Sequence, residues 1–149
     1  PVQVAVLINT IASGGLYCEP KLVEGLVNEN LNYIQKTAKP NLTRVLSKEC
    51  AQNLIQYMKA SVEYGTSIRG KPDEGIAAAK TGTAQTGIKV NDHSVIQAWY
   101  AGIFPADKPK YSIIVFAEDA KGGGESCGPV FKKIAQEIFY NVLKNREVD

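Results

Sequence analysis

The segment Ile76-Ala77-Ala78-Ala79-Lys80-Thr81-Gly82-Thr83 joins a run of small apolar residues to the polar tetrapeptide Lys-Thr-Gly-Thr. Small residues followed by threonines predict a strand over residues 76–83. Side chains alternate across a strand, so Lys80 and Gly82 should share one face, and Thr81 and Thr83 the other. Because Gly82 has no side chain, another backbone could approach the strand closely there. The segment therefore combines a strand with groups suited to binding.

Two further segments predict the remainder of a sheet. Residues 95–104 and 111–117 are rich in β-branched and aromatic residues, and residues 105–110 between them include two prolines and an aspartate. Proline and aspartate are typical of turns, so the two strands should form a hairpin. Hairpin-connected strands pair in the antiparallel sense.

Three segments predict helices that flank this sheet. Residues 1–13 are apolar on nearly all sides, as in a helix buried on several sides. Ser47 is suited to cap a helix over residues 47–64, whose apolar residues recur with helical spacing. Pro129 opens an amphipathic helix over residues 129–144. We therefore predict an α+β fold with an antiparallel sheet and flanking helices.

The segment between the first two helices has weaker signals. Residues 16–45 contain two prolines and several asparagines, which favour irregular structure. Short strands are expected around residues 22–27 and 31–35.

Composition limits the classes of function. The 149 residues match one domain, and a hydrophobic content of 44% is ordinary for a globular protein. The formal charge is +2 and no cluster of lysine and arginine marks a nucleic-acid interface, so no nucleic-acid partner is predicted. No uninterrupted apolar run exceeds five residues, which is too short to cross a membrane.

The cysteines do not predict a metal site or a cofactor. Cys18, Cys50 and Cys127 are scattered, and the sequence has one histidine and no Cys-x-x-Cys pair. An odd number of cysteines argues against a complete disulfide framework. Three partly buried free thiols are expected, since free cysteine behaves as a small hydrophobic residue.

Five short motifs occur in an order that is specific to one family. They are Pro1-Val2-Gln3-Val4-Ala5, Ile11-Ala12-Ser13-Gly14-Gly15, Lys80-Thr81-Gly82-Thr83-Ala84-Gln85, Ala98-Trp99-Tyr100-Ala101-Gly102 and Phe104-Pro105-Ala106-Asp107. Together they span residues 1–107, most of the chain, and resemble the C-terminal part of a penicillin-binding protein transpeptidase domain. The likeness is greatest to the monofunctional class B D,D-transpeptidases. It implies part of the fold shared with serine β-lactamases.

The resemblance implies a function. Such enzymes cross-link peptidoglycan stem peptides by serine acyl transfer and bind β-lactam antibiotics. It assigns Lys80 and Thr83 to catalysis, and Thr81, Gly82 and Thr83 to substrate binding. The parent protein would act on the extracytoplasmic face of the bacterial plasma membrane, anchored by an N-terminal segment that this chain lacks.

The resemblance also shows what this chain lacks. The family's nucleophile lies in a Ser-x-x-Lys motif. None of the seven serines has a lysine three positions on, and none has an asparagine two positions on, as a Ser-x-Asn motif requires. We therefore interpret residues 1–149 as a C-terminal fragment of one transpeptidase domain that is inactive alone and needs the upstream portion as its partner.

Missing neighbours would also affect association. Without the upstream strands, residues 111–117 would form an unpaired apolar edge, and the apolar first helix would lose contacts. Such edges recruit other chains, so self-association of the fragment is expected.

Two other functions remain open. A serine β-lactamase or a penicillin-sensing domain shares the Lys-Thr-Gly motif. A non-catalytic module could keep the peptide-binding groove without a nucleophile. A Ser-x-x-Lys motif in the upstream reading frame would separate the enzymes from the module.

Several further residues allow two interpretations. Trp99 and Tyr100 could border the cleft, but packing within the sheet is favoured. His93, beside Asn91 and Asp92, could suggest a His–Asp pair, but a solvated loop histidine is favoured.

Two glycine-containing segments are harder to interpret. Gly122-Gly123-Gly124 could bind an anion, but it lacks a P-loop ending and is interpreted as a flexible loop near the site. Gly65-Thr66-Ser67 matches a Gly-Thr segment often found upstream of the Lys-Thr-Gly motif in the family, and its role cannot be derived from the sequence.

Overall fold

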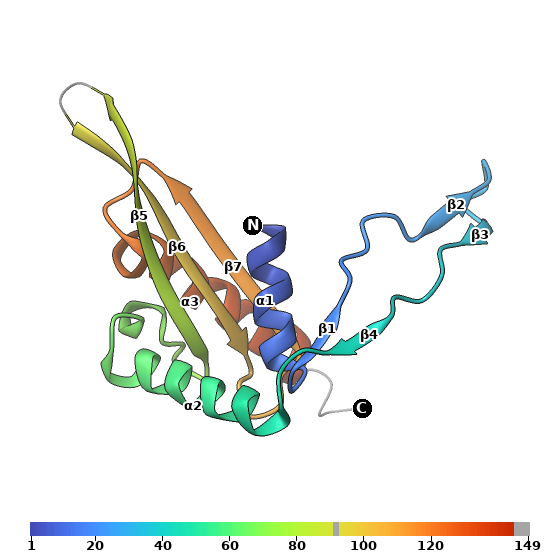
Figure 1. Ribbon diagram of the computed structural model, residues 1–149, viewed down its shortest axis with the longest axis horizontal. Coiled ribbons are helices and arrows are strands. Elements are labelled where there is room, and N and C mark those ends of the chain that lie inside the picture. The colour runs from blue at the N-terminus through green and yellow to red at the C-terminus, as the bar shows by residue number, and fades with distance from the viewer. Residues whose placement is uncertain (91–92, 145–149) are drawn as a thin grey trace.

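The computed structural model describes residues 1–90 and 93–144, and its centre is a three-stranded antiparallel sheet (Figure 1). The strands are β5 (Ala78–Val90), β6 (His93–Phe104) and β7 (Tyr111–Glu118), in the order β5-β6-β7. The predicted strands and the hairpin are confirmed. The first strand, however, continues to Val90 instead of ending at residue 83, because its pairing with β6 resumes beyond a bulge between Gln85 and Lys89.

The helices agree with the sequence, with one difference at the C-terminal end. They are α1 (Val2–Ala12), α2 (Lys48–Tyr64) and α3 (Gly128–Ile138). The Ser47 hydroxyl accepts a hydrogen bond of 3.0 Å from the Cys50 N–H, which confirms the predicted cap. The last predicted helix is shorter in its α-helical part, because a π-helical turn, η3 (Phe139–Leu143), takes over after Ile138.

An arm built from two pairs of short strands projects from the body (Figure 1). β1 (Leu16–Cys18) pairs with β4 (Leu42–Arg44), and β2 (Gly25–Val27) pairs with β3 (Tyr33–Lys36). The outer pair overlaps the two strands expected in this segment, whereas β1 and β4 were not predicted. β1 and β4 have three residues each and pair with each other although the rest of the arm separates them in the sequence. No local sequence pattern predicts such a pair.

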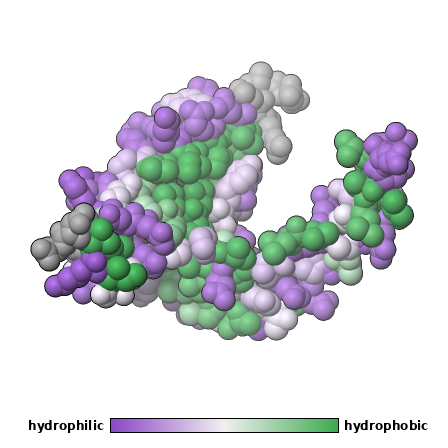
Figure 2. Space-filling model, turned by 90° about the horizontal axis from the view of Figure 1, so that it is seen from above, coloured by the Kyte–Doolittle hydropathy of each residue, from purple (hydrophilic) through white to green (hydrophobic). Residues whose placement is uncertain are grey.

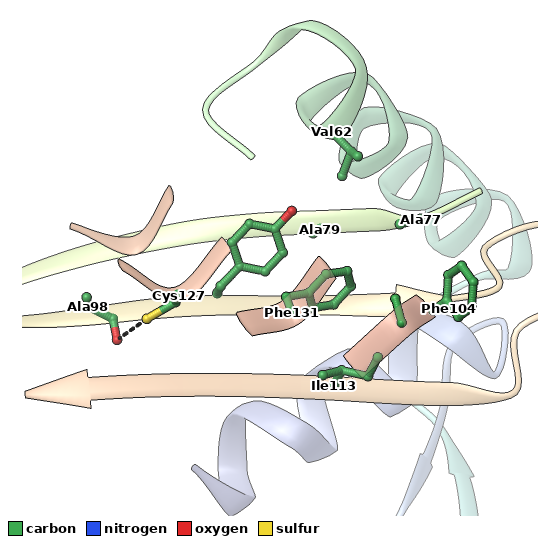
Figure 3. Packing of buried hydrophobic residues seen from close by; sticks show 10 residues of the cluster. Val62, Ala77, Ala79, Ala98, Phe104, Ile113, Cys127 and Phe131 are labelled. Carbon is green, nitrogen blue, oxygen red and sulfur yellow. Dashed lines mark hydrogen bonds between the residues drawn. The ribbon is translucent and has the colours of Figure 1, made fainter. Parts of the chain in front are cut away.

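Apolar clusters lie on both faces of the sheet. One contains Phe104 of β6 and Phe131 of α3 (Figure 3), and the other contains Ile8 of α1 and Ile103 of β6. α2 lies along the start of β5 and contributes to both clusters. The antiparallel sheet with flanking helices is therefore the predicted fold class.

Both outer strands of the sheet have a free side. Within residues 1–90 and 93–144, β5 and β7 each pair with β6 alone. This confirms that residues 80–83 lie on an edge strand antiparallel to residues 98–100. Strand β7 likewise presents an unpaired edge, and self-association through it stays a prediction.

The cysteines are free in the structure. Cys127 is buried and Cys18 is half-buried, but Cys50 is exposed, so the expectation of three partly buried thiols is wrong for Cys50. Burial raises the pKa of the Cys127 thiol, which keeps it protonated and suits a residue of the core. None of the helices in the described part of the chain is both long and apolar enough to cross a membrane.

Candidate active site

The Lys-Thr-Gly-Thr segment lies on β5, where that strand leaves the core. Ala78 and Ala79 are fully buried, whereas Lys80 is exposed and its ammonium group donates a hydrogen bond of 2.7 Å to the Thr81 carbonyl. The register places Thr81 opposite Tyr100 and Gly82 opposite Trp99. The strand is therefore paired with β6 on one side, and within the described residues its other side has no partner strand.

Packing within the chain does not require a glycine at position 82. A Cβ atom built there would lie 3.4 Å from the Trp99 Cβ, an ordinary contact, and would meet nothing closer. Trp99 packs on Phe116 of β7, with ring centroids 4.3 Å apart. The predicted packing role of Trp99 is therefore confirmed, and the chain itself leaves room above Gly82.

The two threonines point to the other face of β5, where a second group of residues meets them. The Thr81 hydroxyl lies 2.9 Å from the hydroxyl of Thr66, and the Thr83 hydroxyl accepts a hydrogen bond of 3.3 Å from the Gly123 N–H. Thr66 follows α2 in the sequence and Gly123 follows β7, so tertiary structure brings three distant segments together. We call Thr66, Thr81, Thr83 and Gly123 the threonine cluster.

Gly123 begins η2 (Gly123–Cys127), a π-helical turn packed directly on the sheet. It is buried, and a Cβ atom there would collide with the Trp99 carbonyl oxygen and lie 2.6 Å from the Gly82 carbonyl oxygen. The sequence predicted a flexible loop over residues 122–124, near the site. Instead, the backbone at Gly123 rests against β5 and β6 at the motif, which only glycine permits.

A buried serine anchors the turn that carries Thr66. The Ser67 hydroxyl lies 2.8 Å from that of Ser61, and the Ser67 carbonyl accepts a hydrogen bond of 2.7 Å from the Tyr100 hydroxyl. Burial raises the pKa of Tyr100 above its ordinary value, so this donor stays protonated. Tyr100 is fully buried, which confirms its predicted packing role.

Sequence reasoning thus noticed the segments of three residues that shape the site, Thr66, Ser67 and Gly123, but assigned them no contact with the motif. The Gly-Thr segment was a signal for the first two, but no spacing rule connects it to β5. Asp92 lies outside the described residues, so the suggested His93–Asp92 pair stays untested. The backbone of His93 begins strand β6 and pairs with Val90, so the expected loop position of this histidine is wrong. Among the described residues, no group of three or more histidine, cysteine, aspartate or glutamate side chains could hold a metal ion.

The fold and the motif match one family of known proteins. The family model of the penicillin binding protein transpeptidase domain matches residues 1–136. The peptidoglycan D,D-transpeptidase PbpA of Mycolicibacterium smegmatis is 33% identical over 135 residues, which cover 87% of this chain and 27% of that protein. The chain belongs to the penicillin-binding protein transpeptidase domain family.

Solved structures agree with this assignment. A peptidoglycan synthetase from Bifidobacterium adolescentis superposes with a TM-score of 0.79 at 27% identity, over 94% of this chain and 26% of that one. Penicillin-binding protein A of Mycobacterium tuberculosis, solved as an imipenem acyl-enzyme complex, gives a TM-score of 0.74 at 27% identity, over 93% of this chain and 30% of that one. The chain thus spans about 27% of the length of the PbpA relative.

Proposed function

We propose that residues 1–149 are the C-terminal part of a single transpeptidase domain of a peptidoglycan D,D-transpeptidase. They supply the strand with the Lys-Thr-Gly motif, which forms one side of the active site. An upstream portion of the same domain would bring the serine nucleophile. The observation that carries the proposal is the motif on the open side of β5, with Lys80 exposed and room above Gly82. The parent would work outside the bacterial plasma membrane, held there by an anchor outside these residues.

The substrate would bind β5 as an added strand. A stem peptide ending in D-Ala-D-Ala is extended, and an edge strand can pair with an extended peptide through backbone hydrogen bonds. Gly82 would let the peptide backbone come close. The hydroxyls of Thr81 and Thr83 would donate hydrogen bonds to the terminal carboxylate, and a β-lactam would use the same contacts through its own carboxylate.

Lys80 and the backbone of Thr83 would act on the reacting atoms. The charge of Lys80 favours the anionic substrate and can assist proton transfer near the leaving amine. The Thr83 N–H would be one of two oxyanion donors, the other coming from the upstream serine. The contact between Lys80 Nζ and the Thr81 carbonyl supports this role, because it indicates that the backbone groups of Thr81 point to the unpaired side of β5. Alternate residues of a strand direct their backbone groups to the same side, so the Thr83 N–H should point there as well. Loss of one oxyanion donor costs about 3 kcal/mol in acyl transfer.

The alternative functions differ in whether the protein forms an acyl-enzyme and in what happens to the acyl group. A β-lactamase would release the acyl group quickly to water, a penicillin-sensing domain would keep it as a signal, and a binding module would form no acyl-enzyme. The transpeptidase would transfer the acyl group to an amine on a neighbouring stem peptide. The names of the relatives favour the transpeptidase.

A labelling experiment tests the division between the two parts of the domain. Because no serine here has the required lysine, the 149-residue chain alone is expected to form no covalent adduct with a fluorescent penicillin. The longer parent protein should be labelled, and an excess of unlabelled penicillin should block the label. A blockable band at the mass of the short chain on a denaturing gel would overturn the assignment.

Substitution of Gly82 separates folding from binding. Gly82→Ala should leave the melting temperature nearly unchanged, because the new Cβ makes an ordinary contact with Trp99. It should lower the rate of acylation of the parent by about tenfold, because a methyl group then occupies the space for the substrate backbone. Thermal melts and penicillin acylation kinetics measure both effects. Equal acylation rates in Gly82→Ala and wild type would show that the substrate does not approach this face.

A further inference from the structure

We propose that Thr66 is a positioning residue for substrate recognition. Its hydroxyl would orient the Thr81 hydroxyl as a donor to the carboxylate of the incoming peptide or β-lactam. The inference rests on the proposed function and extends the site beyond the Lys-Thr-Gly-Thr segment. It follows from the hydroxyl–hydroxyl contact of 2.9 Å between Thr66 and Thr81 and from the way the Thr66 turn is held.

The direction of the hydrogen bond determines what Thr81 can do. A threonine hydroxyl has one proton to donate and two lone pairs that accept. When Thr81 donates to Thr66, it has no proton left for a ligand. When Thr66 donates to Thr81, the Thr81 proton is free, and the bond it receives polarises its hydroxyl. A carboxylate beside Thr81 favours the second arrangement, because hydrogen bonds to a charged acceptor are stronger than neutral ones.

The contact is accessible to a ligand. The hydrogen bond between the two hydroxyls is exposed, unlike the neighbouring bond from Tyr100 to the Ser67 carbonyl. Two exposed hydroxyls that only stabilised the fold would gain little, because water can replace either partner. The two hydroxyls would contribute more to the binding of a substrate that displaces this water.

The position of Thr66 is set by its surroundings. The next residue, Ser67, is buried, and its N–H donates a hydrogen bond of 3.1 Å to the Ser61 carbonyl. Its hydroxyl lies 3.4 Å from the carbonyl oxygen of Ala79, on the strand that carries the motif. On the other side, a Cβ atom at Gly124 would lie 2.6 Å from the Thr66 carbonyl oxygen. The Thr66 backbone is therefore held between the core and η2, so its hydroxyl is presented to Thr81 without a further ordering cost.

The experiment measures acylation of the longer parent protein by two thioesters with the same acyl group. In one, the leaving group ends in a carboxylate, and in the other it ends in a neutral amide. Thr66→Val, which removes the hydroxyl and keeps the shape, should lower kcat/KM for the anionic thioester by about fivefold. For the neutral thioester the change in kcat/KM should stay within about twofold, since the Thr81 hydroxyl, oriented by Thr66, then has no charged acceptor. Thr66→Ser should restore most of the activity toward the anionic thioester.

Three controls make the outcome decisive. Thr86→Val removes another hydrogen-bonded hydroxyl of β5, three residues beyond the motif and bonded to the Val95 carbonyl, and should change neither reaction. In a Thr81→Val background, Thr66→Val should not lower kcat/KM for the anionic thioester further, because the Thr81 hydroxyl that Thr66 orients is already absent. Thr66→Ala provides a second deletion should the valine variant melt early.

Three results would overturn the inference. An equal loss toward both thioesters and an additive double mutant would each indicate a purely structural role, and the third result is an unaffected Thr66→Val variant. If the wild-type parent reacts with neither thioester nor penicillin, the proposed function itself fails and this inference falls with it. A reactive wild type with an unaffected Thr66→Val variant removes the inference alone.

Discussion

Gly123→Ala is expected to lower the free energy of unfolding by about 3 kcal/mol, the upper end of the cost of inserting a methyl group into a packed interior. The new Cβ would collide with the Trp99 carbonyl oxygen and lie 2.6 Å from the Gly82 carbonyl oxygen and 3.1 Å from the Gly82 nitrogen. All three atoms are backbone atoms of paired strands, so none can rotate away. Either η2 lifts from the sheet, or β5 and β6 shift at the motif.

The adjacent glycine offers a matched control. A Cβ at Gly122 would lie 3.6 Å from the Thr83 hydroxyl oxygen, an ordinary contact, so Gly122→Ala should cost little. Denaturant unfolding of both variants measures the difference, and penicillin acylation of the parent shows whether the motif has moved. Equal stability of Gly122→Ala and Gly123→Ala would mean that η2 does not rest on β5 as the structure has it.

Lys80→Met in the parent protein is expected to lower the acylation rate by roughly a hundredfold or more, because in the function proposed above Lys80 supplies both a charge beside the substrate carboxylate and a group that assists proton transfer. The fold should tolerate the change. Lys80 is exposed, and its ammonium group donates a hydrogen bond to the carbonyl of the next residue in the strand. The change therefore tests chemistry more than stability.

Lys89→Met is the control for this substitution. Lys89 is also exposed and lies on the same strand, beyond the bulge that follows the motif. A general loss of positive charge would slow both variants, whereas a role at the site slows Lys80→Met alone. Stopped-flow acylation with a chromogenic β-lactam measures both rates. A Lys80→Met variant that reacts at the wild-type rate would remove Lys80 from the mechanism.

Much of the fold follows from local patterns. The cap at Ser47, the apolar stripe of α2 and the turn residues between β6 and β7 each act within a few residues, so propensity and spacing were sufficient to predict them. The strand that carries Lys80 was also predicted, although not its length. Beyond residue 83 its pairing depends on a bulge opposite β6, and a single-strand pattern does not show a partner's register.

The site was predicted only in part. The Lys-Thr-Gly-Thr segment is contiguous, so the sequence and the resemblance indicated it directly. Thr66 and Gly123 lie in segments that follow α2 and β7, and they reach Thr81 and Thr83 through contacts that no periodicity describes. The glycine run was therefore interpreted as a flexible loop, although Gly123 is buried against two strands.

The sequence by itself determined the helices and the three strands of the central sheet, the family and the residues of the motif, because capping, alternation and motif order are short-range properties of the chain. Only the tertiary structure decided which side of β5 stays open, which residues meet the face that the threonines share, and which two distant turns supply Thr66 and Gly123. Those features depend on strand register and on the close approach of backbones, and both are set when the helices and η2 pack onto the sheet.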